Sequence, residues 1–250
     1  PGSVAVPVEE EIRRVVPVLR ALHELKVPLS IDTFKTEVMR AALDAGVDLV
    51  NDIAALESEG ALKLVAASNA AVCLMHKQGN PQMMQQAPQY SDVVGEVADY
   101  LTKRCELAIA AGIAPERLLP DPGFGFGKTL EHNLELLRRL DECVVENLPL
   151  LAGMSRKSML GAITGRAVEQ RTAASVVAAL LAAQIKIRLP LTSASIPEPA
   201  NARWPLASGM LSWRRCASRT MACANGWLEP CSTAAASASS ALSSFSAVAM

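Results

Sequence analysis

The sequence is poor in aromatic residues and histidines, and it has no long hydrophobic run. Aromatic residues make up 4% of the chain, and three histidines occur among 250 residues. No apolar stretch approaches the 18 residues that a membrane helix needs, and no basic region followed by an apolar segment opens the chain. We therefore expect neither a membrane span nor secretion. Half of the residues are hydrophobic, which allows a sizeable aliphatic core.

Closely spaced cysteine pairs are also missing. None of the six cysteines forms a C-x-x-C pair, so a zinc or redox site has little support. Cys73, Cys105 and Cys143 each lie alone within an apolar run, which is typical of buried, reduced thiols. We expect a cytoplasmic protein.

The charge is close to balanced over the whole chain but not along it. A formal net charge of −1 gives no reason to expect nucleic acid or an anionic membrane as a partner. Residues 1–184 carry 18 Lys or Arg and 23 Asp or Glu, whereas residues 185–250 carry 6 and 2. This shift in composition divides the chain near residue 184.

Two hydrophobic patterns alternate through residues 1–184. Short runs rich in Val, Ile and Leu predict strands at 27–35, 47–54, 70–77, 117–124 and 148–157. Apolar residues at three- and four-residue spacing predict helices at 8–25, 36–45, 60–68, 92–111, 130–140 and 171–184. Such a succession calls for a parallel sheet covered on both faces.

Polar residues follow the predicted strands at their C-terminal ends. Asp32, Asn51, His76, Asp121 and the segment 155–157 all occupy such positions. A (β/α)8 barrel builds its site from several strand ends, whereas a doubly wound sheet favours one crevice beside a glycine-rich turn. Because no G-x-G-x-x-G occurs, we predict an α/β TIM (β/α)8 barrel.

The segment 121–128 suits a flat ligand. Pro122 favours an extended Asp121, and alternating glycines permit tight turns close to a ligand. Phe124 and Phe126 supply an apolar wall, beside which a carboxylate can grip a pair of heterocycle N–H groups. The alternative is a glycine-rich turn in which Asp121 caps the next helix.

The remaining candidates have structural alternatives as well. Asp32 could cap the following helix, and the Asn51-Asp52 pair could form an Asx-turn. Ser155, Arg156 and Lys157 could bind an anion or form a solvated basic turn. His76 has no second histidine at metal-ligand spacing, so we do not expect it to hold a metal. Three small polar groups on one rim favour a binding site over three unrelated caps.

These motifs together resemble those of the dihydropteroate synthases. The resemblance covers residues 1–184 and consists of I-D-T-x-K from Ile31, N-D-I from Asn51, D-P-G-F-G-F-G-K from Asp121 and G-x-S-R-K-S from Gly153. It implies that Asp32, Asp121 and Lys157 are catalytic. The implied substrate-binding set is Asp32, Asn51, Ile53, Met75, Asp121, Phe126, Gly153, Ser155, Arg156 and Lys157.

The resemblance also implies the reaction. Such an enzyme joins a dihydropterin pyrophosphate to p-aminobenzoate in folate biosynthesis, is the target of sulfonamides, uses Mg²⁺ bound with the pyrophosphate and commonly forms a homodimer. Ser155 and Arg156 match the side that receives p-aminobenzoate, and Met75 and Phe126 match the pterin pocket walls.

The chain departs from the family pattern at both ends. It opens on Pro1, so we expect the family's first two strands and its Mg²⁺ ligand to lie upstream. The last strand, with its R-x-H motif, is not found after residue 184, although residues 185–188 could begin it. The barrel is therefore predicted to be incomplete, followed by an aberrant, low-complexity tail at 185–250.

We expect that tail to be disordered, and its Ala, Ser, Arg, Trp, Cys and Pro bias suggests an out-of-frame reading of a GC-rich gene. Two other functions stay open, both reached from the same motifs. One is a non-catalytic pterin-binding fragment. The other is a pterin-dependent methyltransferase barrel.

Overall fold

The architecture was obtained as a computed structural model that describes residues 6–25, 27–79, 88–146, 148–187 and 248–249. The predicted disordered tail therefore lies almost entirely outside the described residues. No helix in these ranges is long and apolar enough to cross a membrane.

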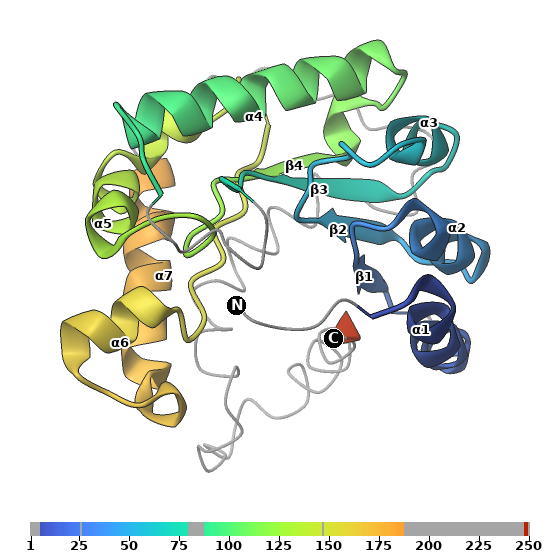
Figure 1. Ribbon diagram of the computed structural model, residues 1–250, viewed down its shortest axis with the longest axis horizontal. Helices are drawn as coiled ribbons and strands as arrows, with labels where there is room; N and C mark the ends of the chain where they lie inside the picture. The colour runs from blue at the N-terminus through green and yellow to red at the C-terminus, as the bar shows by residue number, and fades with distance from the viewer. Residues whose placement is uncertain (1–5, 26, 80–87, 147, 188–247, 250) are drawn as a thin grey trace, which may run out of the picture. The chain divides into compact units, whose positions relative to one another are not determined.

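Four consecutive parallel strands form the sheet that organises the molecule (Figure 1). They are β1 (Ser30–Asp32), β2 (Leu49–Asp52), β3 (Ala71–Met75) and β4 (Leu118–Asp121), each hydrogen-bonded to the next. A two-residue strand, β5 (Val248–Ala249), adds to β1 in parallel. Four of the five predicted strands are thus confirmed.

Helices connect the strands, and all six predicted helices are confirmed. They are α1 (Val8–His23), α2 (Thr36–Asp44), α3 (Ala61–Ala66), α4 (Val93–Ala110), α5 (Leu130–Arg138) and α7 (Thr172–Ile187). A further short helix, α6 (Ser158–Thr164), and three 3₁₀ turns, η1 (Pro115–Arg117), η2 (Leu140–Cys143) and η3 (Val168–Gln170), complete the described elements.

The two faces of the sheet have opposite character because side chains alternate along each strand. Ile31, Val50, Val72 and Leu118 are less than 2% exposed and pack with the helices in one aliphatic core. The register aligns Asp32 with Asn51, and Asn51 with Cys73. These three residues share the other face, so the sheet's polar strand ends are directed away from the helix-side core.

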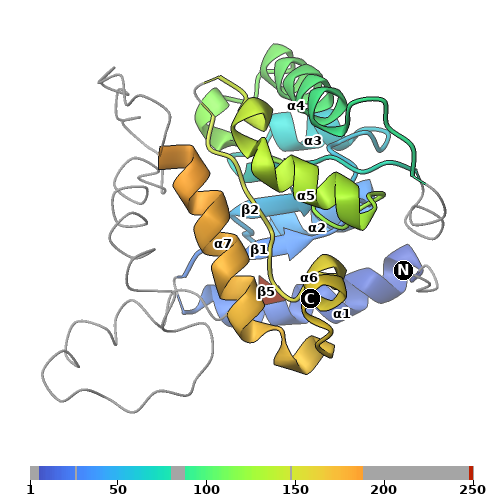
Figure 2. The same cartoon turned by 90° about the vertical axis from the view of Figure 1, so that its left-hand side faces the viewer.

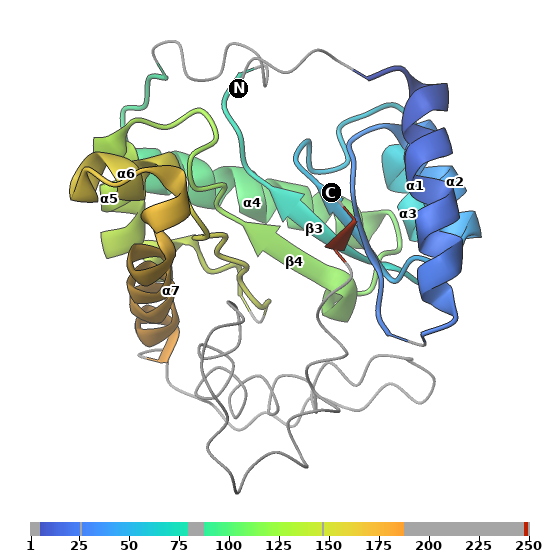
Figure 3. The same cartoon turned by 90° about the horizontal axis from the view of Figure 1, so that it is seen from below.

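A second core holds the later part of the chain together. It joins α4, α5, α6 and α7 through buried residues such as Phe124, Leu136 and Met159. Figure 2 shows α7 beside α5 and α6, and Figure 3 shows β3 and β4 between the α1–α3 group and the α5–α7 group. The two cores therefore divide the molecule into a sheet half and a helical half.

The predicted strand at 148–157 is wrong. The Leu151 N–H donates to the Pro120 carbonyl (2.9 Å), but no ladder follows in the described chain. Gly153 offers no side chain for packing, and Arg156 has φ +51°, which turns the backbone just before α6. Residues 185–187, a possible strand start, instead form the last turn of α7.

Candidate active site

Asp32 and Asn51 lie side by side at the ends of β1 and β2. Asn51 Nδ2 donates a hydrogen bond to Asp32 Oδ2 (3.3 Å). Asp32 lies at the open rim of the sheet. Neighbouring atoms partly shield its carboxyl group from water, which raises its pKa, and the negative charge of Glu11 raises it further. The pair offers one acceptor-rich edge to a ligand.

Asp121 is 7% exposed at the end of β4. Its Oδ1 accepts a hydrogen bond from the Gly123 N–H (2.8 Å), whereas Oδ2 has no hydrogen-bond partner among the described residues. Burial raises the pKa of Asp121, and the Gly123 hydrogen bond and the cations of Lys157 and Lys128 oppose that rise. One oxygen of a buried carboxylate is thus left for a hydrogen-bond donor.

Lys157 extends from the helical half towards Asp121. Its Nζ lies 4.7 Å from the centroid of the Phe126 ring, a cation–π distance. Burial lowers the pKa of Lys157, and Asp121 counteracts this. Its stem passes close to two glycines: a Cβ on Gly125 would lie 3.5 Å from Lys157 Cδ, and one on Gly153 would lie 4.0 Å from Nζ, both ordinary contact distances.

Cys73 is a buried thiol on the same face of the sheet as Asp32 and Asn51. Its pKa is raised well above the ordinary value, first by burial and then by the charges of Asp121, Asp32 and Asp52. Cys73 lies in β3, between the strands that carry these residues. The structure therefore brings Asp32, Asn51, Asp121 and Lys157 around the same strand ends.

The other predicted site residues differ in how deeply they are buried. Met75 is 4% exposed and packs beside Gly123, and Ile53 is half-buried in the turn after β2. Ser155 and Arg156 are exposed, and within the described residues neither side chain makes a hydrogen bond or ion pair. The backbone of Arg156 is held instead, because its N–H donates to Ser175 Oγ (2.9 Å).

Asp52 has the turn-forming role that was the alternative for its segment. It is fully buried on the helix side and accepts hydrogen bonds from the N–H groups of Ala54 (2.7 Å) and Leu56 (2.8 Å). This supports the left-handed conformations of Ala55 (φ 48°) and Leu56 (φ 60°). Arg104 Nε donates to the Ala55 carbonyl (2.8 Å) and closes the turn.

Glu11 contributes to the site region without any signal in the sequence. Its Oε1 accepts a hydrogen bond from Thr33 Oγ1 (2.7 Å), and its Oε2 pairs with Lys35 Nζ (2.5 Å). Helix α1 is thereby tied to the end of β1. The helical spacing of α1 gave no indication of this, because the partners are more than 20 residues away.

The described residues do not form a metal site. No group of three or more His, Cys, Asp or Glu side chains within them is arranged to hold an ion.

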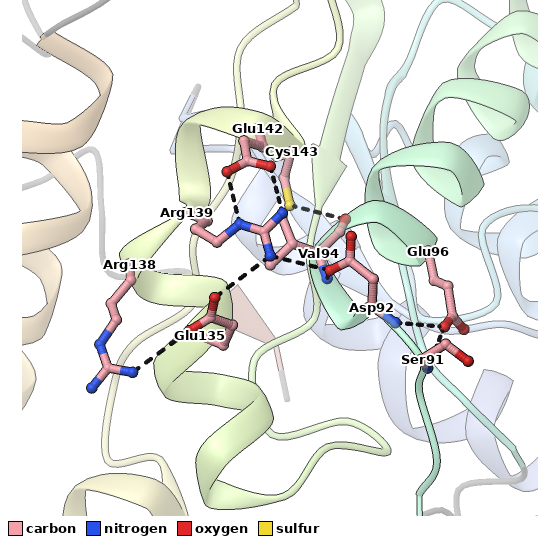
Figure 4. A network of polar contacts seen from close by, with 9 residues as sticks. All are labelled: Ser91, Asp92, Val94, Glu96, Glu135, Arg138, Arg139, Glu142 and Cys143. Carbon is pink, nitrogen blue, oxygen red and sulfur yellow. Dashed lines mark hydrogen bonds and ion pairs between the residues drawn. The ribbon is translucent and has the colours of Figure 1, made fainter.

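A surface hollow of about 500 Å³ lies elsewhere, between the N-terminal end of α4 and the length of α5. Tyr90, Asp92, His132 and Arg139 help to line it, and none of its lining residues is a predicted site residue. Figure 4 shows Arg139 held by ion pairs with Asp92, Glu135 and Glu142. We assign the site to the strand ends, because the unpaired buried carboxylate oxygen lies there.

Comparison with known proteins shows the family of this chain. The sequence pattern of the pterin binding enzyme family matches residues 1–188. The chain belongs to that family. Within it, the chain is 48% identical over 184 residues to dihydropteroate synthase of Escherichia coli (strain K12), covering 73% of this chain and 65% of the relative. A dihydropteroate synthase of Neisseria meningitidis serogroup C is 51% identical over 185 residues.

Solved structures of family members show the same architecture. Dihydropteroate synthase from Stenotrophomonas maltophilia with active site-bound imidazole has 52% identity and a TM-score of 0.71, and the match covers 73% of this chain and 70% of that one. The Burkholderia cenocepacia enzyme complexed with 7,8-dihydropteroate has 49% identity and a TM-score of 0.69, with 74% and 69% covered. The predicted fold class, an incomplete α/β barrel, is confirmed. The match covers about two thirds of the length of the curated relatives.

Proposed function

We propose that this chain carries the pterin half of a dihydropteroate synthase, which condenses 6-hydroxymethyl-7,8-dihydropterin pyrophosphate with p-aminobenzoate. The observation that carries the proposal is the buried Asp121 carboxylate, with one oxygen unpaired among the described residues and Lys157 nearby. Burial makes a hydrogen bond from a ligand N–H worth more there than it would be in water. Relatives named dihydropteroate synthase support the same assignment.

The chemistry follows from the charges at the strand ends. Asp121 Oδ2 accepts from the N–H groups of the pterin ring, and Asn51 and Asp32 contact its far edge. As pyrophosphate leaves, positive charge spreads over the pterin methylene carbon, and the carboxylates of Asp32 and Asp121 stabilise it. Lys157 donates to the ring carbonyl, and Phe126 and Met75 cover the ring faces.

The second substrate approaches from the segment 153–157. Ser155 and Arg156 are exposed there, and a guanidinium is suited to a carboxylate such as that of p-aminobenzoate. A related structure, the Xanthomonas albilineans enzyme with 4-aminobenzoic acid, matches this chain with 51% identity and a TM-score of 0.69. In this proposal Mg²⁺ would bind together with the pyrophosphate of the pterin substrate and would neutralise its charge as it leaves.

The test is calorimetry on the full chain. We expect 6-hydroxymethyl-7,8-dihydropterin pyrophosphate to bind with a 1:1 stoichiometry in titrations with and without Mg²⁺ and p-aminobenzoate. Formation of 7,8-dihydropteroate, measured by chromatography, would establish catalysis. Absence of any pterin binding would overturn the proposal.

The second candidate is a non-catalytic pterin-binding fragment. The observation that favours it is the contrast between the assembled strand-end residues and the exposed Ser155 and Arg156. Pterin binding without turnover in the same experiment would identify it. Transfer of a methyl group to an acceptor would instead indicate the methyltransferase.

Two further properties complete the proposal. Cys73, Cys105 and Cys143 are buried free thiols, which supports a cytoplasmic location. Val177 and Leu181 on α7 are 56% and 46% exposed, which supports a homodimer formed by covering them. Light scattering on the full chain, compared with a Leu181→Glu variant, tests the dimer: both proteins running as monomers would exclude it.

A further inference from the structure

Lys128 is a cation buried almost completely beside the proposed pterin site. Its residue is 3% exposed, in the loop between β4 and α5. Its Nζ donates to the carbonyl oxygens of Gly123 (3.0 Å) and Phe126 (3.1 Å) and lies 2.9 Å from His76 Nδ1. An ammonium group has three hydrogens, and here each of them meets one acceptor.

The two carbonyls are the ends of one tight turn. The Phe126 N–H donates back to the Gly123 carbonyl (3.1 Å), so Lys128 binds the turn that displays the Phe126 ring. On the opposite side of the ammonium, His76 belongs to the chain leaving β3, directly after Met75. Lys128 thus connects the two walls of the proposed pterin pocket, Phe126 and Met75.

The turn and the His76 segment are packed so closely that there is no space for a side chain on Gly123. Gly123 has φ +68°, and a Cβ built there would lie 1.9 Å from the His76 carbonyl oxygen. The His76 N–H also donates to the Asp121 carbonyl (2.9 Å). The backbone of Asp121, the Gly123–Phe126 turn and the His76 ring are therefore held as one unit, and the Lys128 ammonium is at its centre.

The ammonium also selects the form of the histidine ring. When Lys128 donates to Nδ1, the His76 ring proton must be on Nε2. His76 packs edge-on against Tyr100, with ring centroids 5.0 Å apart. Burial lowers the pKa of His76 to about 3, and the charge of Lys128 contributes, so the ring is neutral at physiological pH.

We infer that Lys128 is a positioning residue of the pterin subsite, which fixes Phe126 and Met75 through its contacts with the Gly123–Phe126 turn and His76. This inference rests on the proposed function. It assigns Lys128 no contact with the ligand, in contrast to Lys157, which points over the Phe126 ring. The sequence motif includes Lys128 but gives no sign of this role.

The charge state of Lys128 sets the conditions of the test. The titratable groups that face it are Asp121 on β4, His76 after β3, Cys143 in η2 and Lys157 before α6. Burial lowers the pKa of Lys128 to about 7, so measurements at pH 6 keep the ammonium form.

The experiment compares Lys128→Met, which keeps the length of the side chain and removes its charge, with Lys103→Met on the exposed surface of α4. We expect Lys128→Met to weaken binding of 7,8-dihydropterin pyrophosphate about 10- to 30-fold at pH 6 and Lys103→Met to leave it unchanged. Nitrogen NMR of His76 in the ligand-free protein should show the Nε2–H form in the parent chain and a mixture in Lys128→Met. Unchanged affinity together with an unchanged ring form would overturn the inference.

Two outcomes need a separate readout. If the parent chain does not bind pterin, the proposed function fails, while the His76 ring form still decides whether Lys128 fixes this histidine. If Lys128→Met does not fold, His76→Gln and His76→Phe test the same contact from the other side. We expect His76→Gln, which keeps an acceptor, to retain affinity and His76→Phe to lose it; equal affinities would overturn the inference.

Discussion

The sheet half and the helical half hold their site residues by different means. In the sheet half, Asp32, Asn51 and Asp121 extend from strands whose ladders fix the backbone. In the helical half, the segment 151–157 has one backbone hydrogen bond to the sheet, from the Leu151 N–H to the Pro120 carbonyl, and Lys157 at its end contacts the Phe126 ring. A ladder fixes the place of a side chain whatever its identity, so substitutions in the sheet half separate chemistry from folding more cleanly.

The largest effect is expected where the sheet half is most tightly packed, at Gly123. A methyl group there would lie 1.9 Å from the His76 carbonyl, and φ is +68°. We expect Gly123→Ala to lower the free energy of unfolding by at least about 3 kcal/mol in urea titrations. The control is Gly112→Ala: it has φ +97° but nothing within 4 Å, so only about 1 kcal/mol should be lost. Equal losses would show that backbone strain, not crowding, dominates at both positions.

The next largest effect concerns chemistry rather than folding. Replacing Asp121 by Asn removes a buried charge but keeps an oxygen for the Gly123 N–H. We expect Asp121→Asn to weaken pterin binding about 100-fold, roughly 2.7 kcal/mol, without lowering the melting temperature. Calorimetry and thermal unfolding measure the two quantities.

The matched control for this substitution is Asp44→Asn, on the exposed end of α2. It should change neither quantity. A fall in melting temperature for Asp121→Asn, with affinity retained, would contradict the separation of chemistry from folding in the sheet half.

A smaller effect is expected from pH. Burial lowers the pKa of His76 from about 6.5 to about 3, so the unfolded chain binds the proton between these values and the folded chain does not. Stability is therefore complete above pH 6.5 and falls as the pH drops towards 3. At pH 5 the loss from this group is about 2 kcal/mol relative to pH 7.

The variant His76→Gln removes this titration and should flatten the pH dependence between 7 and 5 in urea unfolding. The raised pKa values of Asp32, Asp52 and Asp121 act in the opposite direction as the pH falls, and these groups are present in both proteins, so the difference between the two curves isolates His76. Parallel curves for the parent chain and the variant would exclude His76 as the source.

The smallest effect is expected in the helical half, at Arg139. Its ion pairs with Asp92 (3.2 Å), Glu135 (3.5 Å) and Glu142 (2.7 Å) join the start of α4 to the end of α5 (Figure 4). These groups are largely exposed and screened by salt. We expect Arg139→Met to lower the melting temperature by about 2 °C or less, with no difference from the parent chain in 1 M salt. A larger, salt-independent fall would mean that Arg139 acts through packing.

The helices and strands that follow a regular hydrophobic pattern could be predicted from the sequence. The four strands of the sheet half and six helices follow from hydrophobic spacing. The same spacing predicts Asp32, Asn51 and Asp121 at strand ends, and parallel strands bring these ends to one edge. The prediction of a strand at 148–157 was wrong because an apolar composition is compatible with any buried conformation. Only the positive φ of Arg156 and the lack of a ladder among the described residues exclude a strand there.

The roles of the residues that hold the site in place could not be predicted from the sequence, for a different reason. Asp52 and Asn51 are adjacent, but the alternation of β2 directs one towards the helix-side core and the other towards the site. Glu11 and Lys128 acquire their partners through contacts between segments far apart in the chain. Hydrophobic periodicity contains no information on such pairs.

The order of the strands has a consequence for synthesis. Because β1, β2, β3 and β4 are neighbours in the order in which they occur, each ladder can close as soon as the ribosome releases the next strand. Asp121 is then in place before Lys157 has been made. We expect the pKa of Asp121 to be higher in a nascent chain that ends after α5 than in the full chain, because the cation of Lys157, which opposes the rise, is not yet present.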